Sequence, residues 1–492
     1  MHDDILDALR YTRERIVSDL QQSKPYIPDG SPSDFESGLH VNYNELSKYI
    51  PINVLFAFHR MSRQGECYIV GGAALNVAAR IYQMLHYAPG DPNDWDMFTS
   101  VHPQRIMELF PDAVPISGQD GRVYTVTLPK HDIEISTFRK DGKRDTFGEN
   151  VIEHLNTCDF TINAIAMTPH GLLISQQTLD DMKEKRLRCV GDANDRINED
   201  SNRVVRAIRF ASRYNMTLDD DLRRILTQYD ISQIPKENIQ KELMKSITYP
   251  RSIELLMETG MLGKIFPKMG VMESMTAGKN HLENLLDHSI MVYVHGVTLQ
   301  PTPLFALTCL LHDYGKVDTM TEEGKAYGHD KLGADQVTEL MKDLSFSNDD
   351  VAYVTTLIRY HMAGYVEELR TGTWLKIFDT FQKNGVPVED LVKLQYADHK
   401  GRITPNAEET PEYESYRDQN QCWIAYKKSQ ERKLPVSTND LDINGHDIMA
   451  LGIPAGPRVR DVLEQLHALV ANEVIQNKKE ELLMAATEII QS

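Results

Sequence analysis

The sequence is poor in cysteine and has no long hydrophobic run. Its five cysteines, spread over 492 residues, form no CxxC pair, so neither a disulfide framework nor a zinc knuckle is predicted. No segment approaches the roughly 18 apolar residues of a membrane-spanning helix, and the N-terminus is acidic where a signal peptide is basic. These absences argue against an exported or membrane-spanning protein and favour a reducing, cytoplasmic setting.

Positive charge is also scarce. The chain has 53 Lys+Arg and 72 Asp+Glu, a formal net charge of -19. Non-specific binding to nucleic acid depends on counterion release by Lys and Arg, so this balance argues against a protein that coats nucleic acid. Residues 183–213 differ, because they contain nine basic and five acidic residues, an excess of four positive charges. We interpret this window either as a local surface for phosphate groups or as a solvated helix face.

The length predicts two to four domains, because single cores stop growing at roughly 250–300 residues. Strand-like segments between about 51 and 190 indicate an α+β domain, and helical periodicity dominates after it. The predicted division is a helical extension and linker at 1–50, an α+β head at 51–190, a helical neck and body at 191–275, a helical metal-binding domain at 276–402, and a linker with a helical tail at 403–492. We expect the extension to be a helix over 3–22, followed by a linker at 24–38 that contains Pro, Gly and Ser. We also expect 402–420 to be an exposed connection.

A glycine pair follows the strand-like run CYIV and precedes a helical run. Gly71 and Gly72 have no β-carbon, so a phosphate chain can approach the backbone, and the N-terminus of the next helix favours an anion. A simple tight turn is the alternative interpretation.

Three acidic residues lie in two strand-like segments downstream. In NDWDMFTS, Asp94 and Asp96 share one face of a strand, and Trp95 faces the other side. In DIEISTF, Glu134 faces away from the core. Carboxylates on neighbouring strands suit magnesium ions, which can activate a hydroxyl and stabilise a leaving pyrophosphate. The alternatives are a solvated acidic turn and a surface glutamate.

Four segments in order resemble the class II tRNA nucleotidyltransferase/poly(A) polymerase family, which belongs to the polymerase-β-like superfamily. They are the glycine pair, DWD, CDFTINAIAM (158–167) and EDSNRVVRAIRFASR (199–213). The resemblance implies a mixed-sheet head followed by all-α domains, and two substrates, CTP and ATP. The implied site residues are Asp94 and Asp96 for catalytic Mg2+, Asp159 and Asn163 for the shape of the nucleotide site, and Asp200 and Arg203, with Arg206 nearby, for reading the Watson–Crick edge.

The residue pattern of the last segment agrees with that role. On one helix, Glu199, Arg203 and Arg206 would share a face at i, i+4 and i+7, and an arginine fork beside a carboxylate offers directional donors and acceptors to a base. A surface ladder of salt bridges is the alternative.

The chain departs from the family at two places. Leu75-Asn76 stands where the family usually has Arg-Asp, and Thr157-Cys158 stands where it usually has two arginines. Those arginines are expected to contact nucleotide phosphates, so we interpret the chain as a divergent member of the family.

A second set of motifs resembles the HD phosphohydrolase superfamily. HLENLLDHSIMVYVH (281–295), ALTCLLHDYGKVDT (306–319) and QYADHKGR (395–402) contain histidine, then histidine-aspartate, then aspartate. Imidazole and carboxylate groups suit a divalent transition metal. The predicted ligands are His288, His312, Asp313 and Asp398. His329 and His361 are candidates for a second metal, and His281 and His295 are more simply structural.

The sequence therefore predicts template-independent addition of CCA to the 3′ acceptor end of tRNA, with an added phosphohydrolase activity in the HD segment. One alternative is a poly(A) polymerase of the same family. The other is a phosphohydrolase whose degenerate head only binds RNA. The sequence assigns no role to the first 60 residues and no oligomeric state.

Overall fold

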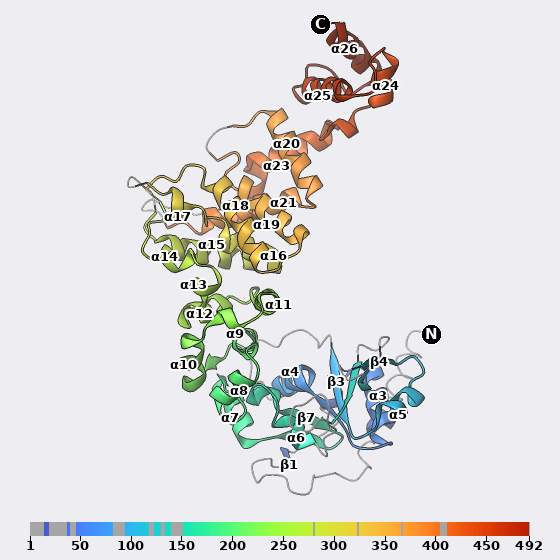
Figure 1. The fold of residues 1–492 in the computed structure, drawn as a ribbon, viewed down its shortest axis with the longest axis vertical. Helices are drawn as coiled ribbons and strands as arrows, with labels where there is room; N and C mark the ends of the chain where they lie inside the picture. The colour runs from blue at the N-terminus through green and yellow to red at the C-terminus, as the bar shows by residue number, and fades with distance from the viewer. Residues whose placement is uncertain are drawn as a thin grey trace. The chain divides into compact units, whose positions relative to one another are not determined.

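The computed structural model describes residues 14–18, 37–39, 46–81, 94–117, 123–128, 133–138, 151–278, 281–321, 324–365, 368–403 and 411–491. The chain divides into two compact units, 1–234 and 235–492, which are described separately (Figure 1). Of the helix predicted at 3–22, only 14–18 lie within the described residues, and these are helical. The linker predicted at 24–38 falls almost entirely outside them.

Eight strands among the described residues of the first unit form a mixed sheet. Its strands are β1 (Ser37–Leu39), β2 (Cys67–Val70), β3 (Trp95–Thr99), β4 (Val114–Ser117), β5 (Val123–Leu128), β6 (Ile133–Thr137), β7 (Ile165–Thr168) and β8 (Gly171–Ile174). Their order across the sheet is β1-β8-β7-β2-β3-β6-β5-β4. The central strand β3 is antiparallel to β2 and parallel to β6. This arrangement brings the acidic segment and the glycine pair together.

The helices of the first unit are α3 (Ile52–Ser62), α4 (Gly71–Ile81), α5 (Pro103–Leu109), α6 (Val151–Leu155), η1 (Thr161–Asn163), α7 (Gln176–Glu184), α8 (Ala193–Glu199), α9 (Arg203–Arg213), α10 (Asp220–Gln228) and η2 (Ile231–Gln233). Helix α4 packs on β2, β3 and β7. In α9 the apolar positions Val204, Ala207, Ile208 and Ala211 recur at helical spacing and are buried, which leaves the arginines between them for other contacts. Two short strands, β9 (Arg186–Leu187) and β10 (Thr217–Leu218), pair in parallel.

In the second unit the described residues form helices with short connections. They are α11 (Lys236–Ser246), α12 (Arg251–Glu258), α13 (Met261–Ile265), α14 (Met269–Met272), α15 (Leu285–Leu299), α16 (Pro303–Leu311), α17 (Lys316–Thr319), α18 (His329–Asp343), α19 (Asn348–Tyr360), α20 (Thr371–Lys383), α21 (Val388–Lys400), α22 (Tyr413–Gln419), α23 (Gln421–Glu431), η3 (Thr438–Asp440), α24 (Gly445–Ala450), α25 (Pro457–Ala471) and α26 (Lys479–Gln491). In α16, every residue from Phe305 to Leu311 is buried, and the helix ends at His312.

The predicted fold class, a mixed-sheet head followed by all-α domains, is confirmed by this architecture and by the structural relatives reported below. One expectation is wrong in part: the segment 402–420 contains α22, whose Tyr413 is buried, so it is not an exposed connection throughout. Among the described residues, none of the helices is long and apolar enough to cross a membrane.

Candidate active site and metal centre

Three carboxylates lie where β3 and β6 run side by side. Asp94 directly precedes β3, and Asp96 is its second residue. Asp96 is in register with Val70, the last residue of β2, and with Glu134 of β6. Trp95 is buried, whereas Asp94 and Glu134 are exposed and Asp96 is half-buried. The strand alternation therefore sends the acidic side chains to the face predicted from the sequence.

Gly71 allows the backbone to approach these carboxylates. It is the first residue of α4 and has a φ of +68°, a conformation that side chains other than glycine rarely adopt. A β-carbon at Gly71 would lie 3.2 Å from Asp96 Oδ2, whereas one at Gly72 would meet nothing within 4 Å. The glycine pair thus leaves open space beside Asp96 at the N-terminus of a helix.

The charges of this site fit a divalent cation. Burial, together with the negative charges of Glu134 and Asp94, raises the pKa of Asp96 to about 6. Each of these effects disfavours the charged form of Asp96, and a bound cation would oppose them. Magnesium binds through a few carboxylates plus substrate phosphates. Asp94, Asp96 and Glu134 would hold such an ion.

Asp159 holds two arginines of α9. Arg203 Nε donates to Asp159 Oδ1 at 3.0 Å, and Arg206 Nε donates to Oδ2 at 2.5 Å. Arg203 also donates from Nη1 to Glu199 Oε2 at 2.7 Å. The Arg203 side chain is only 10% exposed, so its fork is fixed by two carboxylates rather than by solvent.

The single helix expected over 199–206 is interrupted. Helix α8 ends at Glu199, and α9 begins at Arg203. Between them, Asp200 Oδ1 accepts the backbone N–H of Asn202 at 2.9 Å. Short polar side chains offer the backbone such alternatives to helical hydrogen bonds. Glu199 therefore reaches Arg203 across a turn, and Asp200 uses one carboxylate oxygen to stabilise that turn.

Asn163, the other residue predicted to shape the nucleotide site, ends η1. Its Oδ1 is buried without a hydrogen-bond partner. Such an oxygen destabilises a fold by about 1–3 kcal/mol, so an external donor at this position would be stabilising.

The structure shows where the residues that depart from the family pattern, at 75–76 and 157–158, lie. Leu75 and Asn76 are each 1% exposed within α4, so they belong to the packing of the head. Thr157 Oγ1 donates to His154 O at 2.7 Å. None of these residues brings a positive charge to a phosphate.

Six buried residues of the second unit form what we call the metal cluster. His288 lies in α15, Asp398 lies in α21, and the others lie at helix ends. The cluster consists of His288, His312, Asp313, His329, His361 and Asp398, each at most 5% exposed.

Asp313 stands between two pairs of histidines. Its Oδ2 lies 3.5 Å from His288 Nε2 and 3.2 Å from His312 Nε2. Its Oδ1 lies 3.3 Å from His329 Nε2 and 3.7 Å from His361 Nε2. Nitrogen ligands stand about 2.0–2.1 Å from an ion such as zinc, so ligands of one ion lie roughly 3–3.5 Å apart. The two sides of Asp313 therefore resemble two adjoining ligand sets.

Backbone carbonyls orient three of the rings. The Nδ1 atoms of His312, His329 and His361 lie 2.9, 2.7 and 2.7 Å from the carbonyl oxygens of Cys309, Ala326 and Ile358, respectively. A carbonyl only accepts, so each Nδ1 carries the hydrogen and the neutral ring presents the Nε2 lone pair. Each ring is thereby prepared for ligation through Nε2.

Several of the facing atoms have no hydrogen-bond partner of suitable geometry. They are His288 Nε2, His312 Nε2 and both carboxylate oxygens of Asp313, of which Oδ2 forms an ion pair with Lys316. Buried polar atoms without partners are costly, and a metal ion would satisfy all four. The donor set thus fits a divalent transition metal.

Two cations balance the acidic ligands. Lys316 Nζ lies 2.6 Å from Asp313 Oδ2, and Arg402 binds Asp398. Burial opposes ionisation of Asp313, but His312 and Lys316 hold its pKa well below its usual range. Burial, aided by His329 and His312, lowers the pKa of His361 to about 3, so this ring is neutral. The neutral ring of His361 is the form that binds a metal, whereas at His288 burial is outweighed by Asp398 and Glu283, which raise its pKa to about 9, so a metal would displace a proton from that ring.

The structure brings together all four predicted ligands of the HD segment, and also His329 and His361. His295 belongs to none of the groups of metal-ligating atoms within 4.8 Å of one another that the described residues form. Glu283, which the sequence did not single out, does belong to one, with His281 and His288. No local pattern marks it, because it precedes the helix α15 and contacts residue 403 from far along the chain.

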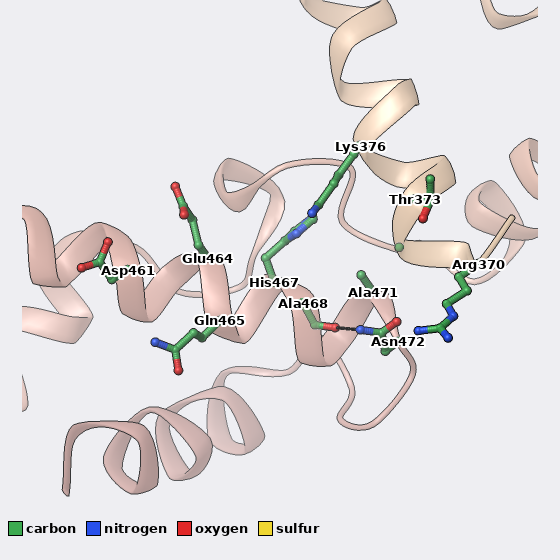
Figure 2. A pocket seen from close by; sticks show the side chains of 11 residues that line it. Arg370, Thr373, Lys376, Asp461, Glu464, Gln465, His467, Ala468, Ala471 and Asn472 are labelled. Atoms are coloured by element: carbon green, nitrogen blue, oxygen red, sulfur yellow. Dashed lines mark hydrogen bonds between the residues drawn. The ribbon is translucent and has the colours of Figure 1, made fainter. Parts of the chain in front are cut away.

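A cavity of about 620 Å³ lies between α20 and α25, outside both sites (Figure 2). Arg370 and Lys376 line it from the side of α20, and Asp461 and Glu464 from α25. These opposite charges define no single ligand chemistry.

The mixed sheet with carboxylates on adjacent strands, continued by an all-helical region, defines the nucleotidyltransferase class of fold. Residues 67–188 match the family model of the poly A polymerase head domain, and residues 329–486 match the one described as tRNA nucleotidyltransferase domain 2, putative. A CCA-adding enzyme of Anoxybacillus flavithermus is 26% identical over 445 residues, which cover 87% of this chain and 94% of that relative. Two separate parts of the chain, the head and the C-terminal helical region, are thus similar to the class II CCA-adding enzyme and poly(A) polymerase family.

Solved structures show the same fold. The CCA-adding enzyme of Bacillus stearothermophilus in complex with CTP has a TM-score of 0.60 at 20% identity, covering 89% of this chain and 96% of that one. The Thermotoga maritima CCA-adding enzyme complexed with tRNA_CCA has a TM-score of 0.54 at 16% identity, covering 91% and 98%.

Proposed function

We propose that the protein adds CMP, CMP and AMP, from CTP and ATP, to the 3′ end of tRNA without a nucleic-acid template. The observation that carries this proposal is Asp96, in register with Glu134 and beside Gly71, with its pKa raised to about 6. Full-length similarity to proteins named CCA-adding enzymes supports the choice of substrate. The proposed compartment is the cytoplasm, on the sequence grounds given above.

In the proposed reaction the RNA 3′-hydroxyl attacks the α-phosphate of the nucleotide, and pyrophosphate leaves. Mg2+, held by Asp94, Asp96 and Glu134, would supply charge neutralisation and activation of the hydroxyl. The open backbone at Gly71 and Gly72 leaves room for the triphosphate. The remaining contribution of the chain is positioning of the two substrates.

The arginines of α9 would select the base. Cytosine and adenine each present a ring nitrogen that accepts a hydrogen bond beside an amino group that donates one, and uracil and guanine present the reverse. An arginine donor beside a carboxylate acceptor complements cytosine and adenine. Asp200 and Arg203, the latter fixed by Asp159 and Glu199, are the proposed selecting residues, and Arg206, also bound to Asp159, lies nearby.

Separate supply of the nucleotides tests this function. With a tRNA that lacks its last three nucleotides, we expect two additions from CTP alone, none from ATP alone and three from both, resolved on sequencing gels. UTP and GTP serve as controls and should not be incorporated. Long tails from ATP alone would instead establish a poly(A) polymerase.

The raised pKa of Asp96 predicts that the rate of nucleotidyl transfer falls at acidic pH, and that the pH of this fall depends on the magnesium concentration. Below pH 6 the folded protein holds a proton on Asp96, so at limiting Mg2+ the transfer rate should fall about tenfold per pH unit as pH drops. The ion competes with the proton, so saturating Mg2+ should move the limb to lower pH. Rate–pH profiles at two Mg2+ concentrations measure this shift. An acidic fall in rate at the same pH in both profiles would contradict the prediction.

A second activity is favoured by the metal cluster. We propose that it hydrolyses phosphate esters at RNA ends with a divalent transition metal held by His288, His312, Asp313 and Asp398. The buried, unpartnered nitrogens and oxygens of this cluster support the proposal. His329 and His361 would hold a second ion on the other side of Asp313.

The domain boundaries predicted from the sequence also stay a proposal. We assign nucleotide binding and transfer to the head, 51–190, together with the first residues of 191–275. The rest of 191–275 would bind RNA, and 276–402 would hold the metal centre. In the alternative function, a degenerate head would only bind RNA and the metal cluster would perform the chemistry.

A further inference from the structure

Glu283 is a buried carboxylate at the edge of the metal cluster. Its side chain is 2% exposed. Oε1 lies 2.6 Å from His281 Nδ1 and 3.4 Å from His288 Nδ1, and Oε2 accepts the backbone N–H of Ile403 at 3.1 Å. A backbone hydrogen bond from Leu282 N to Ile403 O, at 2.9 Å, fixes the same two segments. The carboxylate therefore has a defined position between α15 and the chain that follows α21.

His281, Glu283 and His288 resemble a further metal site by proximity, because their ligand atoms lie within 4.8 Å of one another. Their chemistry indicates otherwise. The 2.6 Å between Glu283 and His281 is a hydrogen-bond distance, shorter than the roughly 3 Å between two ligands of one ion. His288 Nδ1 also faces Gly401 O at 3.2 Å, and a carbonyl only accepts. His288 Nδ1 is therefore a hydrogen-bond donor.

We propose that Glu283 is a positioning residue of the metal centre. Its Oε1, 3.4 Å from His288 Nδ1, shares the single Nδ1 hydrogen of that ring with Gly401 O and keeps Nε2 aimed at Asp313 and Asp398. His281 holds the carboxylate in place. This inference rests on the proposed metal centre.

The Nδ1 partners of His288 differ from those of the other histidines in where they lie in the chain. The rings of His312, His329 and His361 are each held by a carbonyl three residues earlier in the chain. His288 lies in the first turns of α15, and its Nδ1 partners, Glu283 and Gly401, lie outside that helix. A carboxylate partner also makes Nε2 a stronger electron-pair donor than a carbonyl does, and loss of such a partner typically weakens metal binding 10- to 100-fold.

Cobalt binding tests the proposal in the full chain. The metal-free wild type, Glu283→Gln and Glu283→Asp are titrated with Co2+ alone and followed by visible absorption. We expect Glu283→Gln to bind Co2+ about 10- to 100-fold more weakly. Glu283→Asp, which keeps the charge on a shorter side chain, should recover part of the affinity. Glu273→Gln, at an exposed glutamate, is the matched control and should bind like the wild type.

A second measurement separates positioning from general stability. Protons near bound Co2+ are strongly shifted in the NMR spectrum, and the exchangeable ring N–H of His288 can be assigned by its absence in His288→Ala. In Glu283→Gln this signal should exchange with solvent faster than in the wild type. Thermal melting of the metal-free proteins reports any loss of fold.

The outcomes are distinguishable. If wild type binds no Co2+, the proposed metal centre fails and this inference fails with it. If wild type binds but Glu283→Gln matches its affinity and N–H exchange, only the positioning role is overturned. That role is also overturned if the affinity falls only in proportion to a loss of folded protein while the His288 signal is unchanged.

Discussion

Replacement of Asp96 by asparagine should reduce nucleotidyl transfer at least about a thousandfold, equivalent to roughly 4 kcal/mol of transition-state stabilisation. Asparagine keeps the shape of the side chain but removes the charge that lies between Asp94 and Glu134. Because the variant also removes the repulsion that raises the pKa of Asp96, its melting temperature should not fall. The measurement is incorporation of labelled CMP into tRNA lacking its 3′ end.

The matched control is Glu108→Gln, at an exposed acid of α5 in the same unit, which should leave the rate unchanged. Retention of most activity by Asp96→Asn would contradict the proposed site. If, in addition, His312→Ala abolished every activity of the protein, the degenerate-head interpretation would replace it.

Replacement of Asp313 should have the second large effect. Its two oxygens face both pairs of histidines, so Asp313→Asn should weaken binding of Ni2+ or Co2+ more than a hundredfold and remove hydrolysis of RNA ends. Calorimetric metal titration measures the first effect. An oligonucleotide with a terminal 3′-phosphate or 2′,3′-cyclic phosphate measures the second.

Asp313→Asn also leaves Lys316 without its carboxylate, and an uncompensated buried charge can destabilise a protein by about 3–5 kcal/mol. His312→Gln removes one ligand without changing the charge, so the pair of variants separates metal loss from instability. Nucleotidyl transfer serves as the internal control, because the head lies in the other unit. Hydrolysis that persists in both variants would disprove the role of the cluster.

The sequence predicts the acidic face of β3 well because strand alternation is a local property. Trp95 is buried and Asp96 points to the other face, as a period of two requires. The pairing of Asp96 with Glu134 follows from sheet order, which a single sequence does not specify. From the sequence, Glu134 is therefore only a candidate third carboxylate on a neighbouring strand.

Two features of the structure were not predicted from the sequence, and each has a physical reason. The spacing of Glu199, Arg203 and Arg206 fits one helix, but Asp200 accepts a hydrogen bond from the backbone of Asn202, and only the structure shows that this turn interrupts the helix. Glu283 is held in place by the backbone of Ile403, more than a hundred positions later in the chain. Contacts of such sequence separation leave no spacing to recognise.

The division of the chain after Ile234 affects how the two proposed sites can evolve. The carboxylates and arginines of the head all precede this boundary, and every residue of the metal cluster follows it. A substitution in the proposed nucleotidyltransferase site leaves the side chains of the proposed metal centre intact, and the reverse also holds, so selection can relax on either proposed activity while it preserves the other. Descendants of this gene could therefore lose one activity at a time, and such losses would appear as erosion confined to one half of the sequence.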